Sequence, residues 1–173
     1  MLLLNRRKTL FAATALMFGA VGCGFTPVYA PGGTGEALFN QIEVVAPEKI
    51  KTRNTVAAFA LVRALEERLG RGGSTYALDL TLSQRSEGQA ITAENEITRF
   101  SIEGRSDYTL TRRSDGVIVA SGTVNNFTGY SATGSTVETL AGERDAEQRL
   151  MVILADQIVT RLLSTDLTAA PTE

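Results

Sequence analysis

Residues 76–83, YALDLTLS, alternate apolar and polar side chains without a break, and Tyr76, Leu78, Leu80 and Leu82 fall on one parity. Successive side chains of a β-strand point to opposite faces of a sheet, so this stretch predicts a strand that is buried on one face only. The buried face needs an apolar partner layer, and the sequence on either side of the stretch supplies one.

Two more strands are predicted downstream. A polar turn is expected around Glu87 and Gly88, and a long strand over residues 100–110 follows it. Its apolar positions on one parity are Phe100, Ile102, Tyr108 and Leu110. Gly104 lies inside this strand and predicts a bulge or a bend, because glycine leaves a gap in a packed face. The Asp115-Gly116 pair predicts a hairpin turn into a further strand over residues 117–127.

Two amphipathic helices flank these strands. The first is predicted over residues 54–69 and the second over residues 137–163, because apolar residues recur there at spacings of three and four. The apolar positions are Ala58, Leu61, Val62, Leu65 and Leu69 in the first helix and Leu150, Ile153, Leu154, Ile158 and Leu162 in the second. Gly70 can take the left-handed conformation that ends the first helix.

A short strand over residues 41–45, ended by Pro47, completes the order β-α-β-β-β-α. Two apolar helix faces can share one face of a single sheet. The predicted fold is therefore an α+β two-layer sandwich, with a mostly antiparallel sheet of about four strands and both helices on one side.

The N-terminus predicts export. Residues 6–8 are basic and residues 10–21 are mostly apolar, a run too short to cross a bilayer but typical of a signal peptide. The following Ala20-Val21-Gly22-Cys23 resembles the lipobox of bacterial lipoproteins. We therefore expect a signal peptide over 1–22, lipidation of Cys23, a tether over 23–40, one domain over 41–164 and a disordered tail over 165–173.

Composition excludes several kinds of site. The chain has no histidine and one cysteine, so histidine-dependent catalytic sites and histidine-ligated metals are impossible. Removal of residues 1–22 leaves 151 residues with 14 basic and 19 acidic side chains, a net charge of −5. Non-specific nucleic-acid binding requires a dense basic surface and is not expected. We predict no catalytic residue, no cofactor and no metal.

Three sets of side chains remain as candidates for contact with ligands. Strand and turn arginines can meet phosphate groups or simply be solvated; these are Arg85, Arg99, Arg105, Arg112 and Arg113. The carboxylates Glu94, Glu96 and Asp107 are the candidates for a hydrolase, although no spacing signature supports one. The Gly129–Ser135 loop, GYSATGS, lacks the Lys-Ser or Lys-Thr pair of a phosphate loop and is predicted to be a connection or a partner-binding loop.

The string CGFTPVY at 23–29 and the closing string AGERDAEQRLMVILADQIVTRLL at 141–163 complete a pattern that resembles the LptE family of outer-membrane lipoproteins. The resemblance implies a non-enzymatic, lipid-anchored, periplasm-facing domain. It also implies a place inside the LptD β-barrel as plug and assembly partner, in support of lipopolysaccharide transport to the outer leaflet. Gly24 after the acylated cysteine fits sorting to the outer membrane. Lipopolysaccharide-binding residues cannot be placed by this resemblance.

An auxiliary lipoprotein of an ABC-type lipid transporter is the alternative, because that family also begins with a lipobox and folds as a small α+β domain. Identification of the stable partner distinguishes the two.

Overall fold

The computed structural model describes residues 33–47, 50–51, 55–92 and 96–165. Its elements, in chain order, are α2 (Thr34–Leu38), β1 (Ile42–Val44), β2 (Ile50–Lys51), α3 (Thr55–Leu69), β3 (Tyr76–Leu80), β4 (Leu82–Ile91), β5 (Ile97–Arg112), β6 (Ile118–Ser131) and α4 (Thr136–Leu163). The predicted signal peptide, Cys23 and residues 166–173 of the predicted tail lie outside the described residues.

All of the strands belong to one sheet, and β5 is its central strand. β3 and β4 follow one another along one edge of β5, both antiparallel to it, while β6 pairs antiparallel with the other edge. The short strands β1 and β2 pair in parallel with β3 and β4. The mostly antiparallel sheet predicted from the sequence is confirmed, but it has six strands instead of about four. The predicted strand over residues 76–83 is divided between β3 and β4, and the short outer strand β2 was not predicted.

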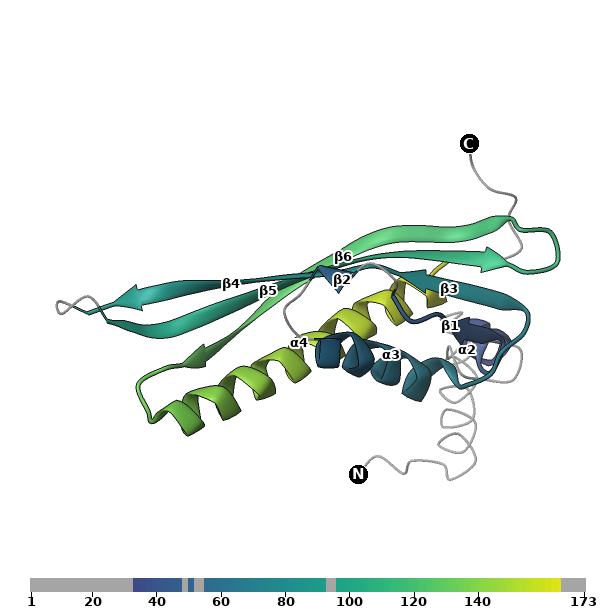
Figure 1. Cartoon of the computed structure of the whole chain (residues 1–173). Coiled ribbons are helices and arrows are strands. Elements are labelled where there is room, and N and C mark those ends of the chain that lie inside the picture. The colour runs from purple at the N-terminus through teal and green to yellow at the C-terminus, as the bar shows by residue number, and fades with distance from the viewer. Residues whose placement is uncertain (1–32, 48–49, 52–54, 93–95, 166–173) are drawn as a thin grey trace, which may run out of the picture.

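Both long helices cover the same face of this sheet, which confirms the predicted two-layer α+β sandwich (Figure 1). The inner layer of the core comes from one parity of the strands, including Leu78, Leu110 and Val124, none of which is exposed. The helices complete the core. α3 contributes Leu61 and Leu65. α4 contributes the residues that face the sheet and α3, which are Leu150, Met151, Leu154, Ala155, Ile158, Val159 and Leu162.

The helix boundaries follow the predicted signals. Gly70 has φ +84°, the left-handed conformation expected for the residue that ends α3, and its N–H donates to Glu66 O over 2.9 Å. The hairpin at Asp115-Gly116 is also present, with Gly116 at φ +71°. The chain therefore reverses at both of these predicted positions.

The predicted turn around Glu87 and Gly88 is wrong. Both residues lie inside β4, where they pair with Ser101 and Phe100 of β5. The strands of this hairpin continue to Ile91 and Ile97, and Thr92 N–H donates to Glu96 O just beyond them. Polar composition suggested a turn, but this part of the strand extends past α3 and has little to bury.

Gly104 has a different role from the bulge expected for it. The pairing of β5 with both neighbours runs without a register shift through this residue. A Cβ placed at Gly104 would lie 2.9 Å from Leu150 Cδ2 and 3.2 Å from Leu154 Cδ1. Glycine fits here because Leu150 and Leu154 of α4 pack directly onto the backbone of β5, and an added Cβ would force these side chains to shift.

Residues 34–38, within the segment predicted to be a tether, form the short helix α2. Leu38 has no exposed surface and belongs to the core. The folded body thus begins before residue 41, and the chain enters it at the end opposite the β4–β5 hairpin (Figure 1).

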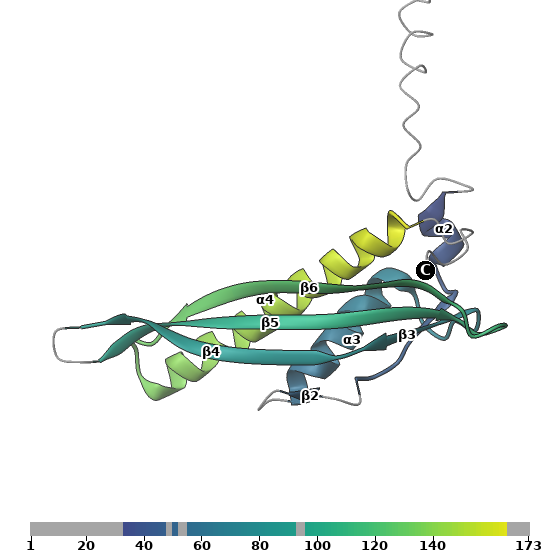
Figure 2. The ribbon, with the colours of Figure 1, turned by 90° about the horizontal axis from the view of Figure 1, so that it is seen from above.

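The molecule is elongated and has two unequal halves (Figure 2). In the two-helix half, α3 and α4 both cover the sheet, which consists there of β1, β3 and residues 106–112 and 118–124. In the distal half, α4 alone covers the sheet, which consists there of residues 84–91, 97–105 and 125–131. The β4–β5 hairpin projects at the far end of this half (Figure 1).

Candidate interaction surface

The face of the sheet that points away from the helices is almost entirely polar. We call it the outer face; it carries the odd-numbered side chains of β4, β5 and most of β6. Representative members are Ser83, Arg85, Glu87, Ser101, Glu103, Arg105, Asp107, Thr109, Thr123 and Asn125, and all are partly or largely exposed. Strand alternation places them there, since the even positions carry the core. A flat surface rich in hydrogen-bonding groups results.

Three of the five candidate arginines lie on this outer face. Arg85 forms ion pairs with Glu87 and, over 3.9 Å, with Glu103. Arg105 donates to Asp107 Oδ1 over 3.0 Å. These surface pairs contribute at most about 1 kcal/mol each, so a partner can compete for the same side chains at small cost.

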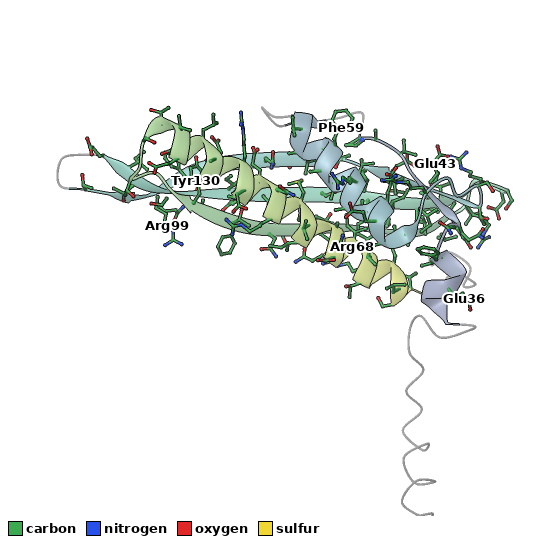
Figure 3. All side chains as sticks on the ribbon, turned by 90° about the horizontal axis from the view of Figure 1, so that it is seen from below. Glu36, Glu43, Phe59, Arg68, Arg99 and Tyr130 are labelled. Carbon is green, nitrogen blue, oxygen red and sulfur yellow. The ribbon has the colours of Figure 1, made fainter. Side chains whose placement is uncertain are left out.

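Arg99 is the third outer-face arginine and lies close to Gly129 of the neighbouring strand. Within the described residues it has no ion-pair partner. Figure 3 shows it in the distal half, on the same part of the sheet as Tyr130. Of the candidate arginines, it is the one whose charge is least neutralised by the fold.

Arg112 and Arg113 lie at the opposite end of the sheet, beside the β5–β6 hairpin. Arg112 pairs with Asp115 over 3.0 Å, and Arg113 pairs with Glu43 at the start of the domain. The five arginines are therefore spread along an elongated sheet, from its distal half to the β5–β6 hairpin, and do not form one anion site.

A depression of about 740 Å³ marks the middle of the outer face. Its lining is Ser83, Gln84, Arg85, Glu103, Gly104, Arg105, Asn125, Asn126 and Phe127. Phe127 is 68% exposed, the one large apolar side chain in this lining. Phe127 ends the strand predicted over residues 117–127, and its odd parity puts its side chain on the outer face.

Asp107 is held by three donors at the centre of the outer face. Thr123 Oγ1 donates to Oδ1 over 2.6 Å, and Thr81 Oγ1 donates to Oδ2 over 3.2 Å. These hydrogen bonds, with Thr123 first, and the Arg105 guanidinium hold the pKa of Asp107 below its usual value near 3.8. The carboxylate stays ionised and its oxygens are occupied.

This arrangement does not support the hydrolase candidates. Glu96 lies just before β5, eleven residues from Asp107 along an extended strand, which separates them by about 36 Å. Two carboxylates that cooperate in glycoside hydrolysis lie within about 10 Å of each other. Glu94 lies outside the described residues.

The opposite side of the molecule has a groove of about 670 Å³ between α3 and α4. Val56 and Phe59 of α3 are 68% and 69% exposed, and Val152 of α4 contributes to the same groove. Phe59 is visible in Figure 3, where Arg68 lies between the two helices and pairs with Asp156. The signal for this groove was in the sequence, since Val56 and Phe59 fall outside the apolar stripe of their helix.

The Gly129–Ser135 segment is a strand end followed by a helix cap. Ser135 is the N-cap of α4, and its backbone N–H donates to Glu138 Oε2 over 2.7 Å. This bond and the one from the Ser135 hydroxyl lower the pKa of Glu138. The N-terminus of α4 therefore already holds an anion, its own glutamate, which agrees with the prediction that this segment is not a phosphate loop.

Two further classes of feature are not seen in the part of the chain that the structure describes. No group of three or more Cys, Asp or Glu side chains is arranged to hold a metal ion. Among the same residues, no helix combines the length and the apolar character needed to cross a membrane. Cys23 and Gly24 cannot be placed because they lie outside these residues.

Comparison with known proteins shows which family the sequence matches and which solved structures share the fold. Residues 39–162 match the LptE family, described as "Lipopolysaccharide-assembly". No curated protein matches the chain. A lipoprotein of Caulobacter crescentus is 21% identical with a TM-score of 0.60, over 76% of this chain and 93% of that one.

Two other solved structures share the architecture at lower identity. The rare lipoprotein B of Shewanella oneidensis is 10% identical with a TM-score of 0.52, over 72% of this chain and 94% of that one. Lipoprotein B of Nitrosomonas europaea is 11% identical with a TM-score of 0.53, over 73% and 83%. These likenesses establish the fold.

Proposed function

The chain belongs to the LptE family of lipopolysaccharide-assembly proteins, and from this we propose that it partners an outer-membrane β-barrel of the LptD kind. In this proposal the domain sits in the barrel lumen as a plug, assists assembly of the barrel and supports delivery of lipopolysaccharide to the outer leaflet. The observation that carries the proposal is the family match over residues 39–162, which spans every described strand and both long helices.

The outer face of the sheet supports this role. A body enclosed by a water-filled lumen needs a polar exterior, and this face offers paired charges and hydroxyl groups in place of apolar side chains. Its ion pairs, such as Arg85–Glu103 and Arg105–Asp107, are exposed and individually weak. They can therefore be exchanged for contacts with a polar barrel wall without loss of the fold.

In this proposal, a lipid anchor at Cys23 orients the domain relative to the membrane. The chain enters the described body at the α2 end, so acyl chains on Cys23 would tie the two-helix half to the membrane and leave the distal half pointing away. One acyl chain binds a bilayer only marginally, whereas two or three hold firmly. Tethering also raises the effective concentration of the domain beside a membrane-embedded partner.

The test is affinity purification of the full chain from the membrane fraction, followed by identification of the proteins that remain bound. We expect one large outer-membrane barrel in near-equal amount. Cys23→Ala is the matched variant: it should fold with an unchanged circular dichroism spectrum but leave the membrane fraction. Recovery of a transporter ATPase complex would favour the alternative function, and recovery of no barrel would refute the proposal.

A further inference from the structure

Among the residues that the structure describes, β6 is an edge strand along its whole length, with β5 on one side and no strand on the other (Figure 2). Ala132 N–H donates to Thr98 O, which fixes the alternation: even-numbered residues of β6 bond to β5, and odd-numbered ones point their N–H and C=O groups outward. The outward residues are Ser121, Thr123, Asn125, Phe127, Gly129 and Ser131. Such a row of backbone groups is a template for another strand.

Side chains occupy part of this row. Arg161 of α4 donates to Thr123 O, and Arg149 of the same helix donates Nη2–H to Gly129 O over 3.4 Å. The Phe127 N–H is bound by the side chain of Asn126 over 2.8 Å. The contact of Arg149 with Gly129 O is long for a hydrogen bond and is easily replaced. The same guanidinium pairs with Asp145 of α4 over 2.8 Å, an exposed ion pair that an incoming carboxylate can exchange at small cost.

The two arginines and the two carbonyl groups are matched in spacing. Arg149 and Arg161 are twelve residues apart, which is about 18 Å along a helix. Thr123 and Gly129 are six residues apart, which is about 20 Å along a strand. Two guanidinium groups therefore stand beside the open edge, one near each end of its central part.

We propose that the open edge of β6 binds an extended acidic strand of another protein. The incoming strand places its own N–H groups on Thr123 O and Gly129 O. Its side chains alternate between the two faces of the extended sheet, and those on the helix side meet the displaced Arg149 and Arg161. The best fit has two carboxylates six positions apart on that side, each pairing with one arginine.

The charge of the edge decides between possible occupants. A second copy of β6 would bring its own Arg149 and Arg161 with it and place four guanidinium groups around one seam, which is repulsive. The opposite edge of the sheet is less suitable for any strand. β2 already covers β4 at Leu82 and Ser83, and the register of β4 is irregular between Gly88 and Ile91.

The binding test uses the purified full chain and synthetic peptides of about eleven residues, long enough to span the edge. The matched peptide alternates threonine and valine and carries two glutamates six positions apart. The control peptide has the same composition with one glutamate moved by one residue, so that the carboxylates face opposite sides. Calorimetry at low salt should show binding of the matched peptide about tenfold tighter than of the control. Hydrogen exchange at the Asn125 amide, which points outward, should slow when the matched peptide binds.

Variants show whether the arginines act as proposed. Arg149→Gln and Arg161→Gln should each weaken the matched peptide about tenfold, as loss of a charge-assisted hydrogen bond does. Arg144→Gln, on the same helix but in the groove facing α3, should bind the peptide normally.

Three results would overturn the proposal: equal binding of the two peptides, no binding at about 1 mM peptide, or self-association of Arg149→Gln with peptide binding unchanged. The last would show that the arginines only keep two copies apart. The site requires neither the lipid anchor nor a barrel, so its failure leaves the proposed function untouched.

Discussion

The two halves of the sheet share the long strands β5 and β6, with β3 beside β5 in one half and β4 in the other, yet they differ in how much they bury. In the two-helix half, α3 and α4 enclose leucines such as Leu61, Leu65, Leu78 and Leu110, all without exposed surface. In the distal half, the sheet contributes Ile102 as its one fully apolar buried side chain among the described residues, and α4 adds Ala146 and Leu150. Stability is thus concentrated at the end where the chain enters the body, and the distal half is free to carry polar surface.

Aromatic contacts partly replace aliphatic burial in the distal half. The rings of Phe100 and Tyr130 stack with their centroids 5.4 Å apart, beneath the first turns of α4. Burial, and secondarily the charge of Glu143, raises the pKa of the Tyr130 hydroxyl. Local opening should therefore begin in the distal half, since it has fewer buried apolar groups to separate.

The largest expected effect comes from the core of the two-helix half. Leu65→Ala removes a fully buried side chain and should lower the free energy of unfolding by about 3 kcal/mol in urea denaturation. Ile97→Ala in the distal half is the matched change. Ile97 is 41% exposed, so its loss should cost less than about 1 kcal/mol. Equal losses would mean that the two halves are equally packed, and the comparison would fail.

The second prediction concerns the boundary between the halves, where α4 rests on Gly104. Gly104→Ala should destabilise the protein by about 1 to 3 kcal/mol, because the added methyl group meets Leu150 and Leu154. Gly142→Ala is the control within α4. A Cβ there has ordinary contacts at 3.7 Å or more, so the change should stabilise the helix by up to about 1 kcal/mol. Thermal denaturation of both variants tests the pair, and a neutral Gly104→Ala would show that α4 can move off the strand.

Sequence patterns predicted the two-helix half well and the distal half poorly, for a physical reason. Alternation is detectable where one face is buried, as at Leu78, Leu80 and Leu82. Residues 84–91 also pair with β5 but extend past α3, so their inner positions tolerate Gln84 and Ser86 and the alternation disappears. The Asp115-Gly116 turn was predictable because it depends on local backbone conformation alone.

The interaction surface was predictable only in part. Strand parity is enough to place Arg85 and Arg105 on one face once the core parity is known. The contacts of Arg149 and Arg161 with the edge of β6 depend on how α4 crosses the sheet, and residues twenty or more positions apart meet there. A local sequence pattern does not predict where a helix crosses a sheet.

A third, smaller effect is expected at the start of α4, which lies in the distal half. This end of the helix is stabilised by a capping box formed by Ser135 and Glu138. Ser135→Ala removes the acceptor for the Glu138 N–H and should cost about 1 kcal/mol. Because the fold lowers the pKa of Glu138, its contribution is present above the usual value near 4.5 and is lost as pH falls through the lowered value. The protection factors for hydrogen exchange in the first turn of α4, which correct the exchange rates for the intrinsic effect of pH, should therefore fall in acid in the native protein. In Ser135→Ala they should be low already at neutral pH, whereas high protection at every pH in both proteins would show that this turn is held by packing.

The smallest effect should appear at Asp107, in the centre of the outer face where the two halves meet. Thr123→Val removes the hydroxyl that contributes most to the low pKa of Asp107 while keeping the shape of the side chain, so the pKa should rise toward 3.8. A lowered folded-state pKa stabilises the fold above the unfolded value, and this stabilisation disappears as pH falls through the lowered one. The native protein should thus lose more stability than Thr123→Val between neutral pH and strong acid. Asp115 is the control, because its low pKa comes first from the Val117 N–H. NMR titration of the carboxyl groups should show that the substitution changes the pKa of Asp107 and leaves that of Asp115 unchanged. If both pKa values change, the hydroxyl acts through the whole sheet, and the two halves are coupled more tightly than their packing indicates.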